Sequence, residues 1–149
     1  MRNVRWFLTG MLALVIVLSF TGAPALAQSA QPASAGNADA ELKTAMTHAG
    51  FAAKYESLKE VSQHLHHTIN CVVGPQDKMF DATAGNPCQG QGNGALPDLK
   101  AKQGSDAEYY EAWWAARVAD EGIASQNLQE AKAAAHVAGL ALQDAQKAK

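Results

Sequence analysis

VSQHLHHTINCVVGP, at residues 61–75, contains three of the five histidines and one of the two cysteines of this 149-residue chain. Apolar side chains recur in and just before it at spacings of three and four, at Leu58, Val61, Leu65, Ile69 and Val72. This periodicity predicts one apolar stripe of an α-helix. Gly74 and Pro75 end the pattern, because glycine accepts the left-handed cap conformation and proline has no backbone donor. We therefore predict a helix that ends at residue 73.

His64 and His67 lie three residues apart, so both side chains lie beside the apolar stripe of this helix. Two imidazole nitrogens at this spacing can chelate copper, zinc or nickel, with the remaining ligands supplied by another helix or by water. The alternative is that both are half-buried histidines that form hydrogen bonds with a neighbouring helix. His66 lies on the other flank and is not part of the candidate pair.

The start of the chain has the features of an export signal. A basic start and the apolar run 6–20 precede a small-residue cleavage site between Ala27 and Gln28. The apolar run is too short to span a bilayer comfortably. We therefore predict a cleaved signal peptide over residues 1–27 and a periplasmic or secreted protein.

The composition of the remaining chain excludes several classes of partner. Residues 28–149 have a formal net charge of −4, because Arg2 and Arg5 leave with the signal peptide. A mildly acidic chain without basic clusters argues against nucleic-acid binding. No other apolar run is long enough to cross a membrane, so we expect no membrane association after cleavage. Residues 28–37 are predicted to form a flexible tether before a single helical domain.

Two cysteines in an exported chain most simply form one disulfide, here between Cys71 and Cys88. A sulfur in a disulfide is neither a metal-binding thiolate nor a nucleophile. A metal site in this chain must therefore depend on histidine and oxygen ligands.

The first half of the domain, residues 38–73, reads as helical, with Asn37 or Asp39 as its N-cap. A break between Gly50 and Ser57 is the alternative, since Ser57 opens a sequence that resembles a capping box. The following segment, 74–105, contains six glycines and three prolines and no helix or strand pattern. We predict an ordered irregular loop there, held to the end of the first helical stretch by the disulfide.

Residues 106–146 form the second helical stretch, and its first turns contain much of the aromatic mass of the chain. Adjacent aromatic residues on a helix cannot all face the core. We therefore predict an interaction surface formed by Tyr110, Trp113 and Trp114.

These features predict an all-α fold, either an antiparallel pair of long helices, kinked or straight, or a small four-helix bundle. A break in the second stretch would fall at residues 122–127. We favour the pair of long helices. In that pair His48 and His136 would approach each other at the end remote from the loop, as a second candidate set of metal ligands.

The leading functional hypothesis is an exported carrier, buffer or sensor that binds copper, zinc or nickel through histidine. The alternative is a non-enzymatic module that binds a protein partner, or a second copy of the chain, through the aromatic surface and the glycine-rich loop. A third hypothesis is haem binding with Met46 or a histidine as axial ligand. The haem would be b-type, because the CxxCH motif needed for covalent attachment is absent. No carboxylate pair or nucleophile motif indicates an enzyme.

Overall fold

The computed structural model describes residues 36–148, which contain five α-helices and no strand. In chain order these are α1 (Ala38–Ala52), α2 (Leu58–Val73), α3 (Ala95–Ala101), α4 (Asp106–Ala124) and α5 (Leu128–Lys147). The prediction of an all-α fold is confirmed. The predicted signal peptide and its cleavage site lie outside the described residues. Within residues 36–148, no helix has the length and apolar character needed to cross a membrane.

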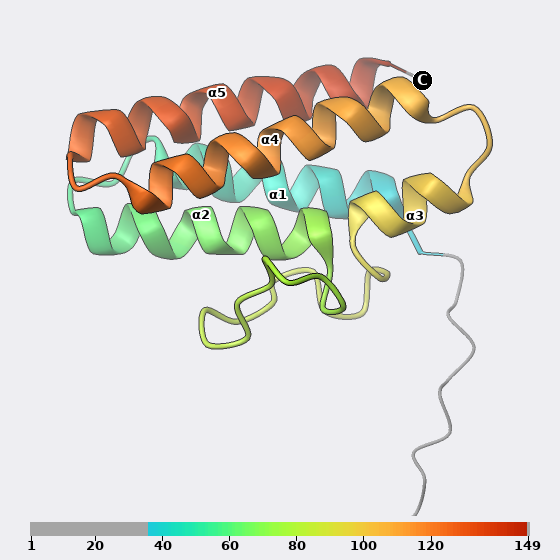
Figure 1. The fold of residues 1–149 in the computed structure, drawn as a ribbon, viewed down its shortest axis with the longest axis horizontal. Helices are drawn as coiled ribbons and strands as arrows, with labels where there is room; N and C mark the ends of the chain where they lie inside the picture. The colour runs from blue at the N-terminus through green and yellow to red at the C-terminus, as the bar shows by residue number, and fades with distance from the viewer. Residues whose placement is uncertain (1–35, 149) are drawn as a thin grey trace, which may run out of the picture.

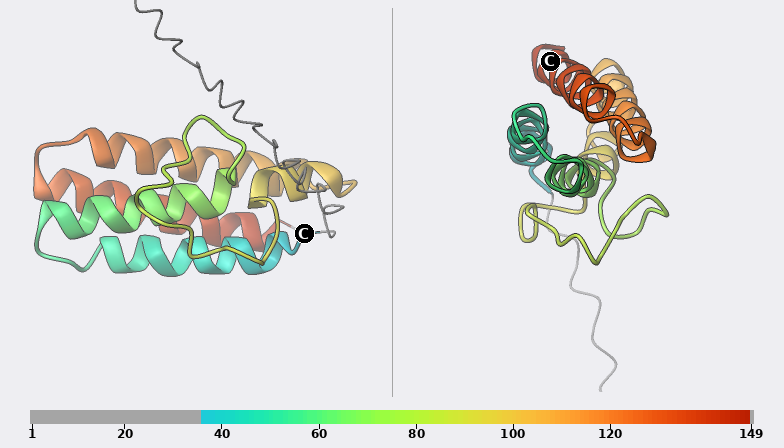
Figure 2. Two further views of the ribbon diagram at one scale, coloured as in Figure 1. Left: turned by 90° about the horizontal axis from the view of Figure 1, so that it is seen from below. Right: turned by 90° about the vertical axis from the view of Figure 1, so that its left-hand side faces the viewer.

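The four long helices lie side by side, α1 next to α2 and α4 next to α5 (Figure 1). Helix α1 also packs against α5, and α2 packs against α4. The short helix α3 packs at one end of the molecule against α1, α2 and α4. The connection from α2 to α3 runs along the outer side of the α1–α2 pair, away from α4 and α5 (Figure 2).

Both long helical stretches are interrupted where a polar side chain caps a new helix. The Ser57 hydroxyl accepts a hydrogen bond from the N–H of Glu60 at the start of α2. The Asn127 side chain accepts from two N–H groups in the first turn of α5. Our preference for two long helices is therefore wrong: such caps satisfy the free donors of a helix start, so the chain can reverse direction there. Gly50 and Gly122, the other predicted weak points, lie inside α1 and α4.

Small residues dominate the core between the helices. Its buried alanines include Ala45, Ala49, Ala52, Ala112, Ala115, Ala119, Ala131, Ala135, Ala138 and Ala145. A Cβ atom on Gly122 would lie 2.8 Å from the Cβ of Ala134 and 2.9 Å from Cδ1 of Leu65. These side chains therefore allow α4 to approach α5 and α2 closely.

The connection after α2 is held by a covalent bond and by a close backbone contact. Cys71 and Cys88 form the predicted disulfide, with their Cα atoms 5.3 Å apart. Gly74 and Gly94 have φ angles of 75° and 109° and lie against each other. A Cβ on Gly74 would lie only 1.7 Å from the carbonyl oxygen of Asn93, so this approach requires glycine.

Helix α3 corrects the prediction that residues 74–105 contain no helix. Pro97 is its third residue, in the first turn, where a backbone N–H has no partner within the helix. Leu96 and Leu99 are buried and hold the helix against the rest of the molecule. Gly94 therefore precedes α3 and Pro97 fits in its first turn, so neither residue excludes a helix here.

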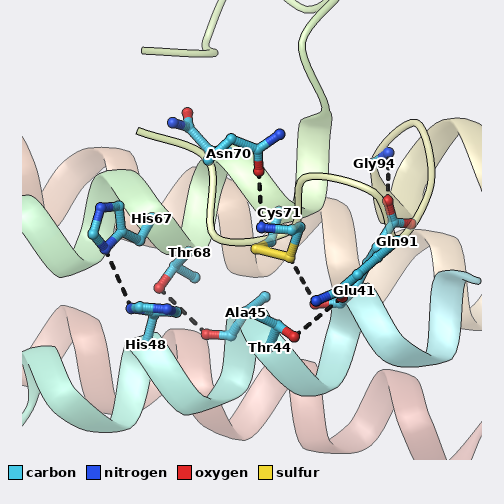
Figure 3. The surroundings of a disulfide bond; sticks show 12 residues. Glu41, Thr44, Ala45, His48, His67, Thr68, Asn70, Cys71, Gln91 and Gly94 are labelled. Carbon is cyan, nitrogen blue, oxygen red and sulfur yellow. Dashed lines mark hydrogen bonds between the residues drawn. A yellow bond between two sulfur atoms is a disulfide. The ribbon is translucent and has the colours of Figure 1, made fainter. Parts of the chain in front are cut away.

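Two buried carboxyl groups, of Glu41 on α1 and Asp98 on α3, bind the connection before α3, and Figure 3 shows the contact of Glu41 with Gly94. Glu41 is fully buried, and its Oε1 accepts from the N–H of Gly94 at 2.8 Å. Asp98 accepts from the backbone N–H and the side-chain amide of Asn93. The pKa of Glu41 is raised to about 8, because burial and, less strongly, the neighbouring Asp98 raise it more than the hydrogen bond from Gly94 lowers it. Glu41 is therefore mostly protonated at neutral pH.

This arrangement predicts that the folded state loses stability as the pH rises toward 8. The pKa of Glu41 is raised above its ordinary value of 4.5. Between pH 4.5 and about 8 the folded chain therefore holds a proton that the unfolded chain has released. The stability that this proton contributes is fully present below about pH 4.5 and is lost as the pH rises to about 8. Glu41→Gln keeps an acceptor for Gly94 and replaces the protonated carboxyl's O–H donor with an amide donor that does not titrate. Urea unfolding at pH 5, 7 and 9 should show a smaller decline for this variant than for the wild type. Glu121→Gln, at an exposed position, serves as the control, and equal declines in all three proteins would contradict the assignment.

The disulfide should contribute substantially to stability. Cys71 and Cys88 are 17 residues apart, and closing a loop of this length removes unfolded-state entropy worth about 3 kcal/mol. The double variant Cys71→Ala, Cys88→Ala should therefore unfold at lower urea concentration, with a free energy of unfolding lower by about 3 kcal/mol. An unchanged transition midpoint would mean that the other contacts of the connection already hold it in place.

Candidate metal centre

Three histidines meet where α1 lies beside α2. Nδ1 of His48, on α1, lies 3.0 Å from Nδ1 of His64 and 3.3 Å from Nδ1 of His67, both on α2. Each histidine offers one ring nitrogen, and these three atoms all lie within 4.8 Å of one another. All three side chains are half-buried.

The local fold explains why these side chains converge. The chain reverses between Ala52 and Leu58, so the last turns of α1 lie beside the first turns of α2. Ala45, three residues before His48, is fully buried and has only a methyl side chain. The Thr68 hydroxyl reaches the carbonyl oxygen of Ala45 at 3.4 Å, a contact between the two helices (Figure 3).

The spacing of the nitrogens suits a transition-metal ion. Zinc binds imidazole nitrogens at about 2.0–2.1 Å, so two nitrogens at the corners of a zinc tetrahedron lie about 3.3 Å apart. The two measured Nδ1–Nδ1 distances from His48 are 3.0 and 3.3 Å. Small ring movements would therefore bring three nitrogens to bonding distance of one ion.

The hydrogen bond of His67 leaves the required lone pair free. Its Nε2 lies 2.7 Å from the carbonyl oxygen of Ala84, and a carbonyl oxygen only accepts, so Nε2 carries the proton. In the neutral ring Nδ1 then has an unshared lone pair that faces His48 (Figure 3). A backbone carbonyl in this position is a common partner of metal-binding histidines, since it orients the ring and raises its basicity.

The electrostatics also keep the rings of His48 and His64 neutral. The pKa of His48 is lowered to about 4, mainly by burial and also by the charges of His67 and His64. Burial lowers the pKa of His64 as well, with His67 acting in the same direction and Glu60 opposing. Both rings are therefore unprotonated at neutral pH, which is the form that binds a metal ion.

Two exposed aromatic side chains border the cluster. The ring of Tyr55 stacks on His64 at a centroid distance of 4.9 Å, and Phe51 presents its edge to His48 at 5.7 Å. Their exposed fractions are 38% and 44%. The three-histidine cluster therefore lies at the surface of the molecule.

The grouping of the histidines in the structure differs from the two sets that the sequence predicted. It unites His64 and His67 with His48, which we had paired with His136. His136 is exposed on α5, in a shallow groove with Met46 and Gly139, and is not part of the group. The expected pairing assumed that α1 and α2 were continuous, whereas the reversal before α2 places His48 opposite α2.

Other predicted positions lie outside the cluster. Cys71 and Cys88 are buried in their disulfide and offer no thiolate. His66 lies on the other flank of α2, with Nδ1 3.5 Å from a carboxylate oxygen of Asp81. Hydrogen bonds from the hydroxyl and the N–H of Thr83 lower the pKa of Asp81, so this carboxylate is ionised.

The predicted aromatic residues are exposed on α4: Tyr110, Trp113 and Trp114 have exposed fractions of 67%, 46% and 49%.

The sequence analysis missed Phe51, Tyr55 and Ala84 as neighbours of the histidines. The spacing of Phe51 from His48 was the one available sequence signal, because residues three apart share a helix face. The role of Ala84 depends on its backbone carbonyl. Every residue has this group, so the sequence contains no signal for the role.

Comparisons of the chain with protein-family models, with curated proteins and with solved structures found no match.

Proposed function

We propose that this protein binds one transition-metal ion, copper, zinc or nickel, through His48, His64 and His67 and serves as a carrier, buffer or sensor of that metal. The observation that carries the proposal is the convergence of three Nδ1 atoms, two of them 3.0 and 3.3 Å from the third. The neutral state of His48 and the hydrogen bond from His67 to Ala84 support it.

The chemistry of the donors defines the class of metal. Imidazole suits zinc, copper and nickel, whereas magnesium and calcium require oxygen ligands. With three protein ligands, water or a donor from another molecule completes the coordination. Met46, whose thioether sulfur would suit copper(I), lies in the groove with His136 on the α5 side of α1.

We also propose that the protein acts outside the cytoplasm after cleavage of the predicted signal peptide. The Cys71–Cys88 disulfide supports an oxidising compartment. An exported metal carrier or sensor would encounter its ion there.

Titration of the purified protein, residues 28–149, with zinc, copper and nickel salts tests the metal proposal. We expect about one ion per chain for at least one metal. Replacing His48 or His64 with alanine removes a direct ligand, so the affinity should fall by more than the 10- to 100-fold typical of losing an outer partner of a ligand.

His66→Ala and His136→Ala provide matched controls, because both remove an imidazole outside the cluster. Both variants should bind the ion with wild-type affinity. The proposal is wrong if wild-type protein binds no ion, or if all four histidine variants lose affinity equally.

The second candidate function is binding of a protein partner or a second copy of the chain through Tyr110, Trp113 and Trp114. Their exposure supports it, since tryptophan and tyrosine are enriched at the centres of protein interfaces.

Sedimentation of the wild type over a range of concentrations tests the version of this candidate in which the partner is a second copy. The variant Trp113→Gln, Trp114→Gln should sediment as a monomer at concentrations where the wild type associates. His64→Ala should associate as the wild type does, because His64 lies on α2, outside this surface. A monomeric wild type at all concentrations would exclude self-association.

A further inference from the structure

Asn70 holds the connection after α2 at three points. This side chain is almost completely buried on α2, at 1% exposure. Its amide group donates to the carbonyl oxygens of Asp81 at 2.7 Å and Gly85 at 2.6 Å, and its carbonyl oxygen accepts from the N–H of Asp81 at 2.8 Å. One side chain therefore satisfies three backbone groups of a segment that contains no helix.

Ala84 lies between the two residues that Asn70 holds. Its carbonyl oxygen is the acceptor for Nε2 of His67, at 2.7 Å. Gly85 follows with a φ angle of 90°, a conformation that turns the chain directly after this carbonyl and that favours glycine. The position of the Ala84 carbonyl is thus determined on both sides by contacts with Asn70.

We infer that Asn70 is a positioning residue of the metal centre, acting through the Ala84 carbonyl on the ring of His67. This inference rests on the proposed metal-binding function. Asn70 touches none of the three Nδ1 atoms, but the segment it holds provides the acceptor that orients one of them. A histidine ring held at Nε2 has a single orientation, and here that orientation directs Nδ1 toward His48.

The disulfide holds the same connection at a different point, and this separates its role from that of Asn70. Cys88 lies beyond Gly85, and its sulfur approaches the backbone of α1 at Glu41. In an Asn70 variant the connection therefore stays attached to α2 through Cys71, while residues 81–85 lose some or all of their hydrogen bonds with residue 70. Loss of the orientation of His67 can then occur without loss of the fold.

The variants Asn70→Asp and Asn70→Ala test the inference. Asn70→Asp keeps the acceptor for the N–H of Asp81 and removes both donors, and Asn70→Ala removes all three hydrogen bonds. Asp77→Ala is the matched control, because it removes a side-chain hydrogen bond to Met79 in the same connection, away from residues 81–85. Circular dichroism and thermal unfolding establish which variants remain folded.

The first measurement uses metal-free protein and the ring Nε2–H proton of His67 in proton–nitrogen correlation spectra. In the wild type and in Asp77→Ala, the hydrogen bond to Ala84 should protect this proton from exchange with water and keep its signal visible. In the Asn70 variants the signal should broaden or disappear. A purely structural role of Asn70 elsewhere in the fold would leave it unchanged.

The second measurement is affinity for the ion that the wild type binds most tightly. We expect a 10- to 100-fold loss in folded Asn70 variants and no loss in Asp77→Ala, as for other outer partners of metal-binding histidines. A folded Asn70→Asp protein with wild-type affinity and a protected ring proton would overturn the inference and leave the metal proposal intact. A wild type that binds no ion would instead overturn the metal proposal, and the ring-proton measurement would then decide whether Asn70 positions His67.

Discussion

The close contact between α1 and α2 is the constraint on which the candidate site depends. Ala45 of α1 is fully buried and has only a methyl side chain, and the backbone of α1 lies close to α2 at this residue. The Thr68 hydroxyl donates to the carbonyl of His64 at 2.9 Å within α2 and also lies 3.4 Å from the carbonyl oxygen of Ala45 on α1. A wider separation of the two helices would place His48 beyond reach of the two rings on α2.

The connection between α2 and α3 completes the site from outside this helix pair. The disulfide, the amide of Asn70 and the contact of Glu41 with Gly94 hold it against α1 and α2. Each is a buried or covalent contact, which explains how a segment rich in glycine keeps a defined backbone. That defined backbone places a carbonyl oxygen at His67, so an irregular segment contributes to the geometry of a site built on helices.

The sequence predicted those parts of the structure that depend on local spacing. His64 and His67 share a helix face because they are three residues apart. Helix α2 ends at Val73, as predicted, with Gly74 as its C-cap. Cys71 and Cys88 paired as predicted because the chain contains no other cysteine. The errors concern the partner of His48 and the short helix α3. The partner of His48 depends on where the chain reverses, and α3 depends on which apolar side chains become buried. The spacing of residues along the chain does not specify either of these features.

The amino-acid sequence by itself determined the helical class, the end of α2, the disulfide and the i, i+3 histidine pair, because periodicity, capping and cysteine count act over one or a few turns. Only the tertiary structure decided that His48 joins this pair, that His136 does not, and that the carbonyl of Ala84 orients His67. The reason is physical. These relations are distances between atoms on segments that meet only after the chain has reversed, and they depend on how closely α1 and α2 pack.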